Sequence, residues 1–225
     1  MGKSNVAVYP KVLGELETLE LVLAGKSIAR YGDGEMNHVM GRKNISQVAD
    51  PKLTVEIAAL LTDPPKSCLV GIPTMNPAGK QTWLKYAPSY ARFLNPKVKY
   101  VSAFISRPDS APWIATPEYF DKVESLWRGQ KVTLVGNGVR SLKPDFLRSH
   151  DADVNFVECP YRDAYSKIDD LERQCLQATR RVILCAGPTA TVLAARLARK
   201  GFHAVDLGHI GMYWRQYTQP FVKSE

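Results

Sequence analysis

The sequence predicts an α/β fold with a mostly parallel sheet that helices cover on both faces. Two observations carry this prediction. Short apolar runs alternate with longer amphipathic stretches along the chain, and polar or glycine-rich residues follow directly after most of the apolar runs. Buried parallel strands are continuous apolar runs connected by helices. Ligands of such sheets bind beyond the carboxyl ends of the strands, so we expect a site in the loops that follow them.

The predicted elements follow one another in a regular order. Apolar residues at helical spacing predict a first helix between Pro10 and Gly25, which ends at the glycine. Strands are then expected at 27–31, 68–72, 98–105, 131–135, 154–157, 182–185 and 203–207. Helices are expected between them, at 51–61, 79–94, 117–127, 162–178 and 188–200.

The composition is that of an ordinary globular protein, and we expect one domain over residues 1–225. Hydrophobic residues make up 45% of the chain and charged residues 23%. No signal-peptide pattern and no membrane-spanning apolar run of roughly 18–20 residues is present, which predicts a soluble, cytoplasmic protein. The four cysteines form no C-x-x-C pair. We expect them to be buried free thiols rather than a zinc or redox site.

The net charge of +8 favours anionic partners, such as nucleotides, phosphorylated lipids or acidic glycans. The basic residues are spread along the chain, without aromatic–basic interleaving, a recognition-helix signature or zinc-ligand spacing. We therefore expect no nucleic-acid partner. Peripheral contact with the inner face of an anionic membrane stays open, a non-catalytic basic binding module is one alternative, and nothing indicates an oligomeric state.

The segment after the first predicted strand reads Arg30-Tyr-Gly32-Asp33-Gly34-Glu35. Two carboxylates two residues apart can converge on one divalent cation, and hard oxygen ligands suit Mg²⁺ or Mn²⁺ shared with a diphosphate. The glycines allow close approach of the backbone, and the arginine can neutralise phosphate charge. A turn that caps the following helix explains the same residues about equally well.

A second glycine-rich turn, Gly136-Asn137-Gly138, follows the strand expected at 131–135. Its backbone N–H groups can cradle a phosphate or a ribose, although a tight strand-exit turn is an equal alternative. Neither the dinucleotide-binding pattern G-x-G-x-x-G nor the P-loop pattern occurs in the chain.

Gly187, Pro188 and Thr189 join the strand expected at 182–185 to the helix that follows it. Proline suits the first turn of a helix, and the free N–H groups of that turn form a natural anion site. Thr189 or Thr191 can add a hydroxyl contact. Simple helix capping is the favoured alternative for these residues taken alone.

Two further candidates stand at strand ends. Arg107 can clamp a phosphate or acceptor hydroxyls, with a salt bridge to Asp109 as the alternative. His209 follows the last predicted strand and can serve as a third metal ligand, a phosphate donor or a base. A lone histidine is more often structural, but its position at a strand end raises the functional interpretation to about even.

Together these motifs resemble a known family, the GT-D-type glycosyltransferases, whose signature is R-[FY]-G-D-G-E. The resemblance begins with residues 27–35 and then follows, in order, residues 41, 47–51, 69–72, 106–108, 159–160, 181–190 and 204–210. It covers nearly the whole chain. Several ordered motifs are far more specific than any one of them.

The resemblance implies a Rossmann-like fold that transfers a sugar from a UDP-sugar, typically UDP-glucose, with Mn²⁺ or Mg²⁺. The expected acceptor is a glycan, a glycoprotein or a lipid-linked glycan. Asp33 and Glu35 are assigned to the metal–diphosphate site with Arg30 nearby, and residues 187–189 to the nucleotide side of the cleft. Arg107 and His209 become candidate site residues.

The chain departs from the family after His209. Family members often continue with an Asp and then Tyr-Glu-Trp, whereas residues 211–217 read Gly-Met-Tyr-Trp-Arg-Gln-Tyr. The missing acids put in doubt any acid–base or acceptor-binding role of these positions and suggest a different acceptor.

The implied mechanism is that a cation held by Asp33 and Glu35 stabilises UDP as it leaves. Backbone N–H groups near Gly187 and the Arg107 guanidinium share the developing charge, and an acceptor hydroxyl attacks the anomeric carbon. No residue is identified as the base, so inversion and retention both stay open.

The alternative enzyme is another nucleotide-binding α/β transferase, of methyl or phosphoribosyl groups. A methyltransferase usually has a glycine-rich loop after its first strand, where this chain has the acidic triplet.

Overall fold

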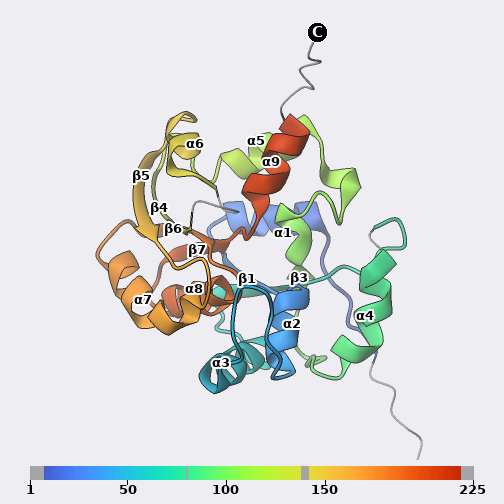
Figure 1. Ribbon diagram of the computed structural model, residues 1–225. Helices are drawn as coiled ribbons and strands as arrows, with labels where there is room; N and C mark the ends of the chain where they lie inside the picture. The colour runs from blue at the N-terminus through green and yellow to red at the C-terminus, as the bar shows by residue number, and fades with distance from the viewer. Residues whose placement is uncertain (1–7, 80, 138–141, 219–225) are drawn as a thin grey trace, which may run out of the picture.

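The computed structural model describes residues 8–79, 81–137 and 142–218, and its centre is one parallel sheet. Seven strands pair in the order β3-β2-β1-β7-β6-β4-β5 (Figure 1). Their bounds are β1 (Ser27–Arg30), β2 (Cys68–Ile72), β3 (Val101–Ser102), β4 (Lys131–Gly136), β5 (Asp153–Glu158), β6 (Arg181–Cys185) and β7 (His203–Asp206). The predicted parallel α/β sheet is confirmed.

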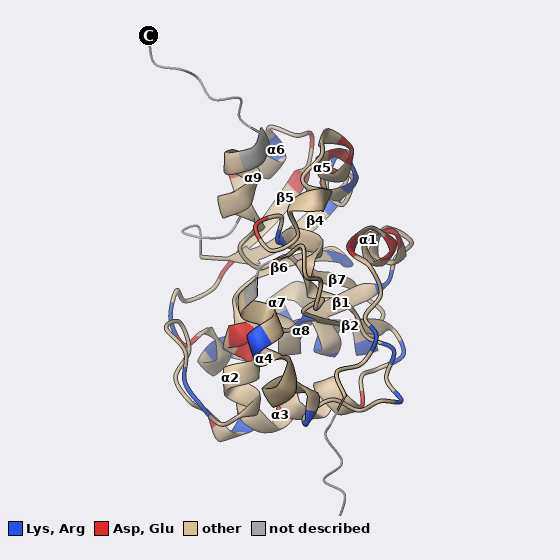
Figure 2. Cartoon of the chain, turned by 90° about the vertical axis from the view of Figure 1, so that its right-hand side faces the viewer, with Lys and Arg blue, Asp and Glu red and all other residues tan. Residues whose placement is uncertain are grey.

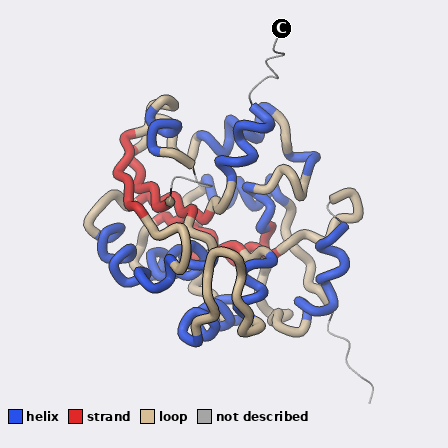
Figure 3. The backbone as a smooth tube through the Cα atoms, viewed as in Figure 1, coloured by secondary structure: helices blue, strands red, loops and turns tan. Residues whose placement is uncertain are grey.

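Helices lie on both faces of this sheet, so the strands form the middle of three layers (Figure 3). In Figure 1, α2, α3, α7 and α8 lie below the sheet, and α1, α5, α6 and α9 lie above it. Their bounds are α1 (Glu15–Leu23), α2 (Asp33–Val39), α3 (Pro51–Thr62), α4 (Gln81–Ala91), α5 (Pro117–Glu124), α6 (Pro144–Arg148), α7 (Ile168–Leu176), α8 (Pro188–Arg199) and α9 (Ile210–Thr218). Three short 3₁₀ helices complete the chain: η1 (Ala103–Ser106), η2 (Pro112–Ile114) and η3 (Ala164–Lys167).

Helix α8 is the most deeply buried helix of the described part of the chain, because it packs against both central strands, β1 and β7. Its small and branched apolar side chains allow this close packing, and Pro188 occupies its first turn, where a missing N–H costs nothing. The Thr191 hydroxyl donates a hydrogen bond of 2.9 Å to the Arg30 carbonyl oxygen at the end of β1. Helix and strand end are thereby fixed to each other directly beside the predicted site.

The predicted strands are all present, but one of them is much shorter than expected. Only Val101 and Ser102 of the segment 98–105 pair as β3, and the chain then turns into η1. The Ser102 hydroxyl causes this turn by accepting the Phe104 N–H, as an N-cap does. Hydrogen-bonding serines favour such local turns over continued sheet pairing.

Three helices were not expected from the pattern: α2, α6 and α9. Of these, α2 matters most, since it begins at Asp33 and converts the predicted loop 32–35 into a helix start. It has only seven residues, too few for a clear apolar period.

The central strands β1 and β7 form the switch point of the sheet. The chain places β2 and β3 on one side of β1 and the four later strands on the other. At such a point the loops after neighbouring strands run apart and leave a crevice beyond the carboxyl ends. The residues that end these strands, Arg30 and Asp206, lie at the bottom of that crevice.

All four cysteines are buried and free, as predicted. None of the helices in the described ranges is long and apolar enough to cross a membrane. In the view of Figure 2, Lys and Arg are spread over many elements rather than gathered along one.

Candidate active site

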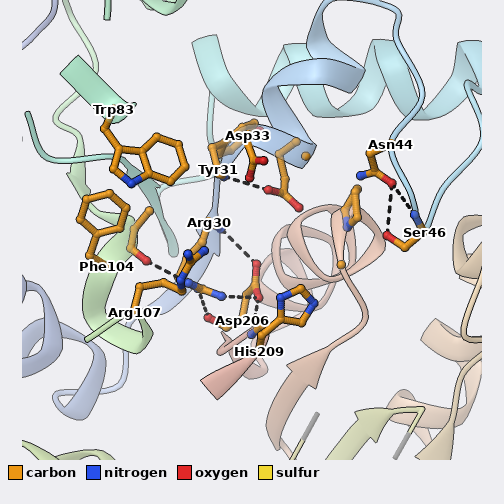
Figure 4. Close-up of a pocket in the computed structure, with 17 residues that line it drawn as sticks. Arg30, Tyr31, Asp33, Asn44, Ser46, Trp83, Phe104, Arg107, Asp206 and His209 are labelled. Atoms are coloured by element: carbon orange, nitrogen blue, oxygen red, sulfur yellow. Dashed lines mark hydrogen bonds and ion pairs between the residues drawn. The ribbon is translucent and has the colours of Figure 1, made fainter. Parts of the chain in front are cut away.

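A cleft of about 720 Å³, partly open to solvent, lies at the switch point. The loops after β1, β6 and β7 line it, together with side chains from η1 and α4 (Figure 4). A second, smaller lobe of about 450 Å³ continues the cleft toward β4 and β5. The two lobes share Ser46, Gly187, Pro188 and His209. The loops predicted to carry the site are thus brought together at one edge of the sheet.

The two acids of the signature are presented by the first turn of α2. Gly32 is the N-cap, and its N–H donates a hydrogen bond of 2.8 Å to Glu35 Oε2, so the carboxylate reaches back over the helix start. Asp33 is exposed and Glu35 partly buried, and both line the cleft. The capping and ligand-binding interpretations are therefore compatible, because capping uses one Glu35 oxygen. A Cβ at Gly34 would lie 2.9 Å from Asn44 Nδ2, so a larger residue there would displace the Asn44 side chain.

The charge of Glu35 is poorly compensated in the folded protein. Burial raises the pKa of Glu35 to about 7, and the nearby Asp206 carboxylate adds to this effect. The Gly32 N–H and the Arg30 guanidinium lower the pKa but do not offset the other two causes. Among the described residues, neither Asp33 nor Glu35 forms a salt bridge. A cation bound at this end of the cleft would compensate the charge of these two acids.

Arg30 lies on the floor of the cleft, where protein groups bind its guanidinium from two sides. Nη2 lies 3.2 Å from Asp206 Oδ1, Nη1 donates to the Ala103 carbonyl oxygen at 2.8 Å, and Nε donates to the Asp206 carbonyl oxygen. Asp206 also accepts hydrogen bonds from the N–H groups of Arg30 and Gly208. The pair joins β1, β7 and η1, and its charges cancel inside the protein.

Gly208 is required by this arrangement. Its φ of +51° lies in the left-handed region, and a Cβ there would approach Arg30 Nη2 to 2.3 Å. Only glycine combines this backbone conformation with room for the guanidinium.

The predicted nucleotide segment 187–189 divides between the cleft and the core. Gly187 and Pro188 line both lobes, and Gly187 has a φ of +57°. Thr189 is fully buried and lies outside the cleft lining, and its hydroxyl has no hydrogen-bond partner among the described residues. Gly187 is the N-cap of α8 and Pro188 begins its first turn, without a side-chain hydrogen bond to the N-terminus of the helix from the described part of the chain.

Arg107 and His209 both line the cleft. The Arg107 guanidinium forms two bonds to Asp109, of 2.7 and 2.8 Å, and lies 5.2 Å from the centre of the Tyr213 ring. The salt bridge considered from the sequence is therefore present, and Arg107 reaches the cleft as part of it. His209 lines both lobes, and its ring lies beside Asp206 in the larger one (Figure 4). No three His, Cys, Asp or Glu side chains of the described ranges group as a metal cage, so a role of His209 as third ligand stays a prediction.

The turn after β4 contributes to the smaller lobe only. Asn137 lines that lobe, whereas Gly136 ends β4 in register with Glu158 and Cys185 and does not line either lobe. Gly138, the third residue of the turn, lies outside the described residues.

Several residues of the cleft were not expected from the sequence. Asn44 and Ser46 come from the loop after α2, where Asn44 Oδ1 accepts the Ser46 N–H at 2.9 Å. Trp83 and Phe104, with ring centres 5.4 Å apart, form the opposite end of the cleft (Figure 4). Asp206 had a detectable signal, because it ends a predicted apolar strand two residues before Gly208 and three before His209. The others had none.

The chain matches known proteins in sequence. A family model described as the glycosyltransferase GT-D fold matches residues 28–223. A probable glycosyl transferase Gly of Streptococcus gordonii is 31% identical over 216 residues, covering 88% of this chain and 32% of the relative. The glycosyltransferase GlyD of Streptococcus pneumoniae serotype 4 is 28% identical over 225 residues, covering 89% and 27%. The chain thus spans about a third or less of the curated relatives it matches.

It also matches solved structures over most of their length. One is described as the domain of unknown function 1792 with a distinct glycosyltransferase fold; its TM-score is 0.79 at 28% identity, covering 96% of this chain and 87% of that one. Another, described as a new glycosyltransferase from Streptococcus sanguinis, has a TM-score of 0.76 at 27% identity, covering 92% and 85%. With a family match over nearly all of the sheet and the whole cleft, the chain belongs to the GT-D-fold glycosyltransferase family.

Proposed function

We propose that the protein transfers a hexosyl group, with UDP-glucose as donor, to a hydroxyl group of a glycan, glycoprotein or lipid-linked glycan. We propose Mn²⁺ or Mg²⁺ as its cofactor. The observation that carries the proposal is the pair of carboxylates, Asp33 and Glu35, that faces a cleft at the switch point without a salt-bridge partner among the described residues. Membership of the GT-D family supports the reaction class.

The side chains fit a shared metal better than a protein cage. Mg²⁺ is usually held by one or two carboxylates, while waters and substrate phosphates complete its coordination. Asp33 and Glu35 supply two such groups, and burial together with the Asp206 carboxylate raises the pKa of Glu35, a destabilisation of the ionised form that a bound cation would offset. When bound, the cation supplies Lewis-acid stabilisation of the departing diphosphate.

The two lobes support one orientation of the donor. The smaller lobe contains the amide of Asn137 and the half-exposed ring of Tyr161, groups that suit a base and a ribose. The diphosphate would then lie beside Gly187, whose neighbouring N–H groups begin α8. The sugar and the acceptor hydroxyl would meet in the larger lobe, which Trp83 closes.

Arg30 and Arg107 would act in different ways. Arg30 holds the ends of β1 and β7 together, because its guanidinium is paired with the carboxylate of Asp206. Arg107 also lines the cleft, and its pairing with Asp109 fixes the direction of the guanidinium. In this orientation it can share the charge that develops on the leaving diphosphate.

A donor panel tests the proposal before any acceptor is known. The protein is incubated with UDP-glucose, UDP-galactose, UDP-N-acetylglucosamine and GDP-mannose, with Mn²⁺ or with EDTA, and release of the nucleoside diphosphate is measured. We expect slow UDP release from UDP-glucose that EDTA abolishes. Thermal stabilisation by S-adenosylmethionine or phosphoribosyl pyrophosphate, without stabilisation by UDP, would favour the alternative transferase and sink the proposal.

A further inference from the structure

The outer rim of the smaller lobe is formed by two neighbouring loops, 40–50 after α2 and 159–163 after β5. The Asp163 N–H donates to the Ser46 carbonyl oxygen at 2.8 Å, and the Val48 N–H donates to Asp163 Oδ1 at 2.6 Å. These two hydrogen bonds join the loops into one surface. Its exposed basic and aliphatic side chains are those of Arg42, Lys43, Ile45, Val48 and Arg162, which we call the rim surface. Tyr161, 41% exposed in the same loop as Arg162, lines the smaller lobe beside them.

The aliphatic members of the rim surface are unusually exposed. Ile45 is 80% exposed and Val48 53% exposed, only three residues apart in one loop. Single exposed aliphatic residues are common on proteins, whereas a pair beside a binding cleft points to a contact. Neither side chain lines the cleft, so binding of the donor does not explain them.

The charges of the rim surface are of one sign. Arg42, Lys43 and Arg162 are exposed, and none of them forms an ion pair within the described ranges. The acids of the same loops are used locally, since Asp50 caps α3 and Asp163 accepts the Val48 N–H. The rim therefore combines three exposed basic side chains, none of them in an ion pair among the described residues, with protruding aliphatic groups.

We propose that the rim surface docks the protein on an anionic phospholipid surface. The basic side chains would contact lipid phosphates while Ile45 and Val48 enter the interfacial region, the combination typical of peripheral membrane proteins. The docked protein would present its cleft to an acceptor held at that surface. Vesicle binding itself does not depend on the proposed glycosyl transfer.

The composition favours a lipid surface over other anionic partners. Acidic glycans and nucleic acids offer no apolar phase for aliphatic side chains. Protein interfaces are enriched in arginine and aromatic residues but depleted in lysine, and valine is rare among their energetic anchors, so Lys43 and Val48 fit such an interface poorly. Aliphatic groups flanked by lysine and arginine match a bilayer interface best.

The other edge of the sheet supplies a matched control. Lys26 and Lys66 precede β1 and β2, Arg199 ends α8 before β7, and all three are exposed. They have the same charges as Arg42, Lys43 and Arg162 but lie at the amino ends of the strands. Leu16, 48% exposed on α1, is the corresponding aliphatic control.

The test is co-sedimentation with vesicles of phosphatidylcholine, with and without about one-third phosphatidylglycerol. Each basic residue near an anionic surface is worth about fivefold in binding. We expect R42Q/K43Q/R162Q to bind the anionic vesicles about a hundredfold more weakly, and K26Q/K66Q/R199Q to bind like the wild type. I45S/V48S should lose at least about fivefold, L16S should lose nothing, and salt at about 0.5 M should release the wild type.

Three results would overturn the proposal: equal binding to neutral and anionic vesicles, equal losses in the two charge variants, or full binding by I45S/V48S. Binding of heparin that depends on the same three basic residues, without binding of vesicles, would assign the surface to an acidic polymer instead. Melting temperatures establish that each variant is folded. Because no donor is present, failure here leaves the proposed function standing, and an inactive donor panel leaves the docking proposal standing.

Discussion

Acids lie at the end of β7 and in the first turn of α2, just after the end of β1, and the two places differ in how the negative charge is compensated. At the end of β7, Asp206 is paired with Arg30 and accepts two backbone N–H groups. Just after the end of β1, Glu35 accepts the capping N–H of Gly32, and neither Asp33 nor Glu35 forms a salt bridge among the described residues. The acid at the β7 end is directly paired, whereas the guanidinium groups of Arg30 and Arg107 lie near the two acids of α2 without pairing with them. A buried acid with its arginine is part of the fold; an acid left without one is a candidate for binding a cation.

A matched site elsewhere in the chain sharpens this contrast. At the start of α1, Glu17 reaches back to the N–H of Gly14 at 3.2 Å, the same capping contact that Glu35 makes with Gly32. Glu17 is exposed and distant from the cleft. Comparing Glu17→Gln with Glu35→Gln therefore separates the capping role of such a glutamate from a role in binding.

The largest effect is expected from the acids at the β1 end. Asp33→Asn and Glu35→Gln should each lower metal-dependent UDP release about a thousandfold, because each removes a charge that holds the cation beside the diphosphate. Glu17→Gln, the matched capping variant, should keep wild-type turnover. Wild-type turnover by both cleft variants would remove these acids from the mechanism.

At the β7 end, breaking the pair of Arg30 and Asp206 should lower the free energy of unfolding. Arg30→Met leaves Asp206 buried and unpaired, which should cost about 3–5 kcal/mol of unfolding free energy. The double variant Arg30→Met, Asp206→Leu should recover most of that loss, because it removes both charges. Urea unfolding measures both variants. If the single variant is as stable as the wild type, the pair does not brace the strand ends.

A smaller effect is expected at Gly208. Gly208→Ala should lose more unfolding free energy than Gly41→Ala, although both glycines have positive φ. Backbone strain costs about 1–2 kcal/mol at either position. Only Gly208 adds a clash with Arg30, since nothing lies within 4 Å of a Cβ at Gly41. Displacing the guanidinium should cost about 1–3 kcal/mol more. Equal losses in urea unfolding would show that Arg30 is free to move.

The smallest effect is the pH dependence of Glu35. Its pKa is raised from 4.5 to about 7, so the folded state binds the proton more tightly than the unfolded state. The wild type therefore loses stability as the pH rises from 4.5 to 7, and the loss is complete above 7. Glu35→Gln should become more stable than the wild type across this window, by at most about 3 kcal/mol at pH 8.

Thermal or urea unfolding at pH 4 and pH 8 measures this difference. Glu17→Gln should show no such window, and saturating Mn²⁺ should shrink the advantage of Glu35→Gln, because the cation compensates the ionised carboxylate of the wild type. An advantage of Glu35→Gln that is the same at both pH values would contradict the raised pKa.

The fold followed from the sequence wherever local pattern decides structure. The strand at 68–72 has its predicted bounds, because a short apolar run between turn residues has one stable solution in a parallel sheet. The helix α2 was missed, since seven residues with an internal glycine carry almost no period. The shortening of β3 was missed because one serine hydroxyl redirects the chain.

Only part of the candidate site could be predicted from the sequence. The acids 33 and 35 were identified because both lie in one short motif at a strand end. The partnership of Arg30 with Asp206 joins residues 176 positions apart, so it depends on the strand order, which no local pattern contains. For the same reason the sequence indicated Arg30 as a phosphate ligand, whereas in the structure its guanidinium binds protein groups. The aromatic end of the cleft around Trp83 gave no signal, since tryptophan within a helical pattern predicts core packing.

Calorimetric titration of Mn²⁺ in the presence of UDP tests the central contrast most directly, with wild type, Glu35→Gln and Glu17→Gln measured side by side. We predict one Mn²⁺ per chain for the wild type and for Glu17→Gln, and at least about tenfold weaker binding by Glu35→Gln. Equal Mn²⁺ affinity in all three proteins would contradict the account, because the uncompensated acids at the end of β1 would then not be the metal site.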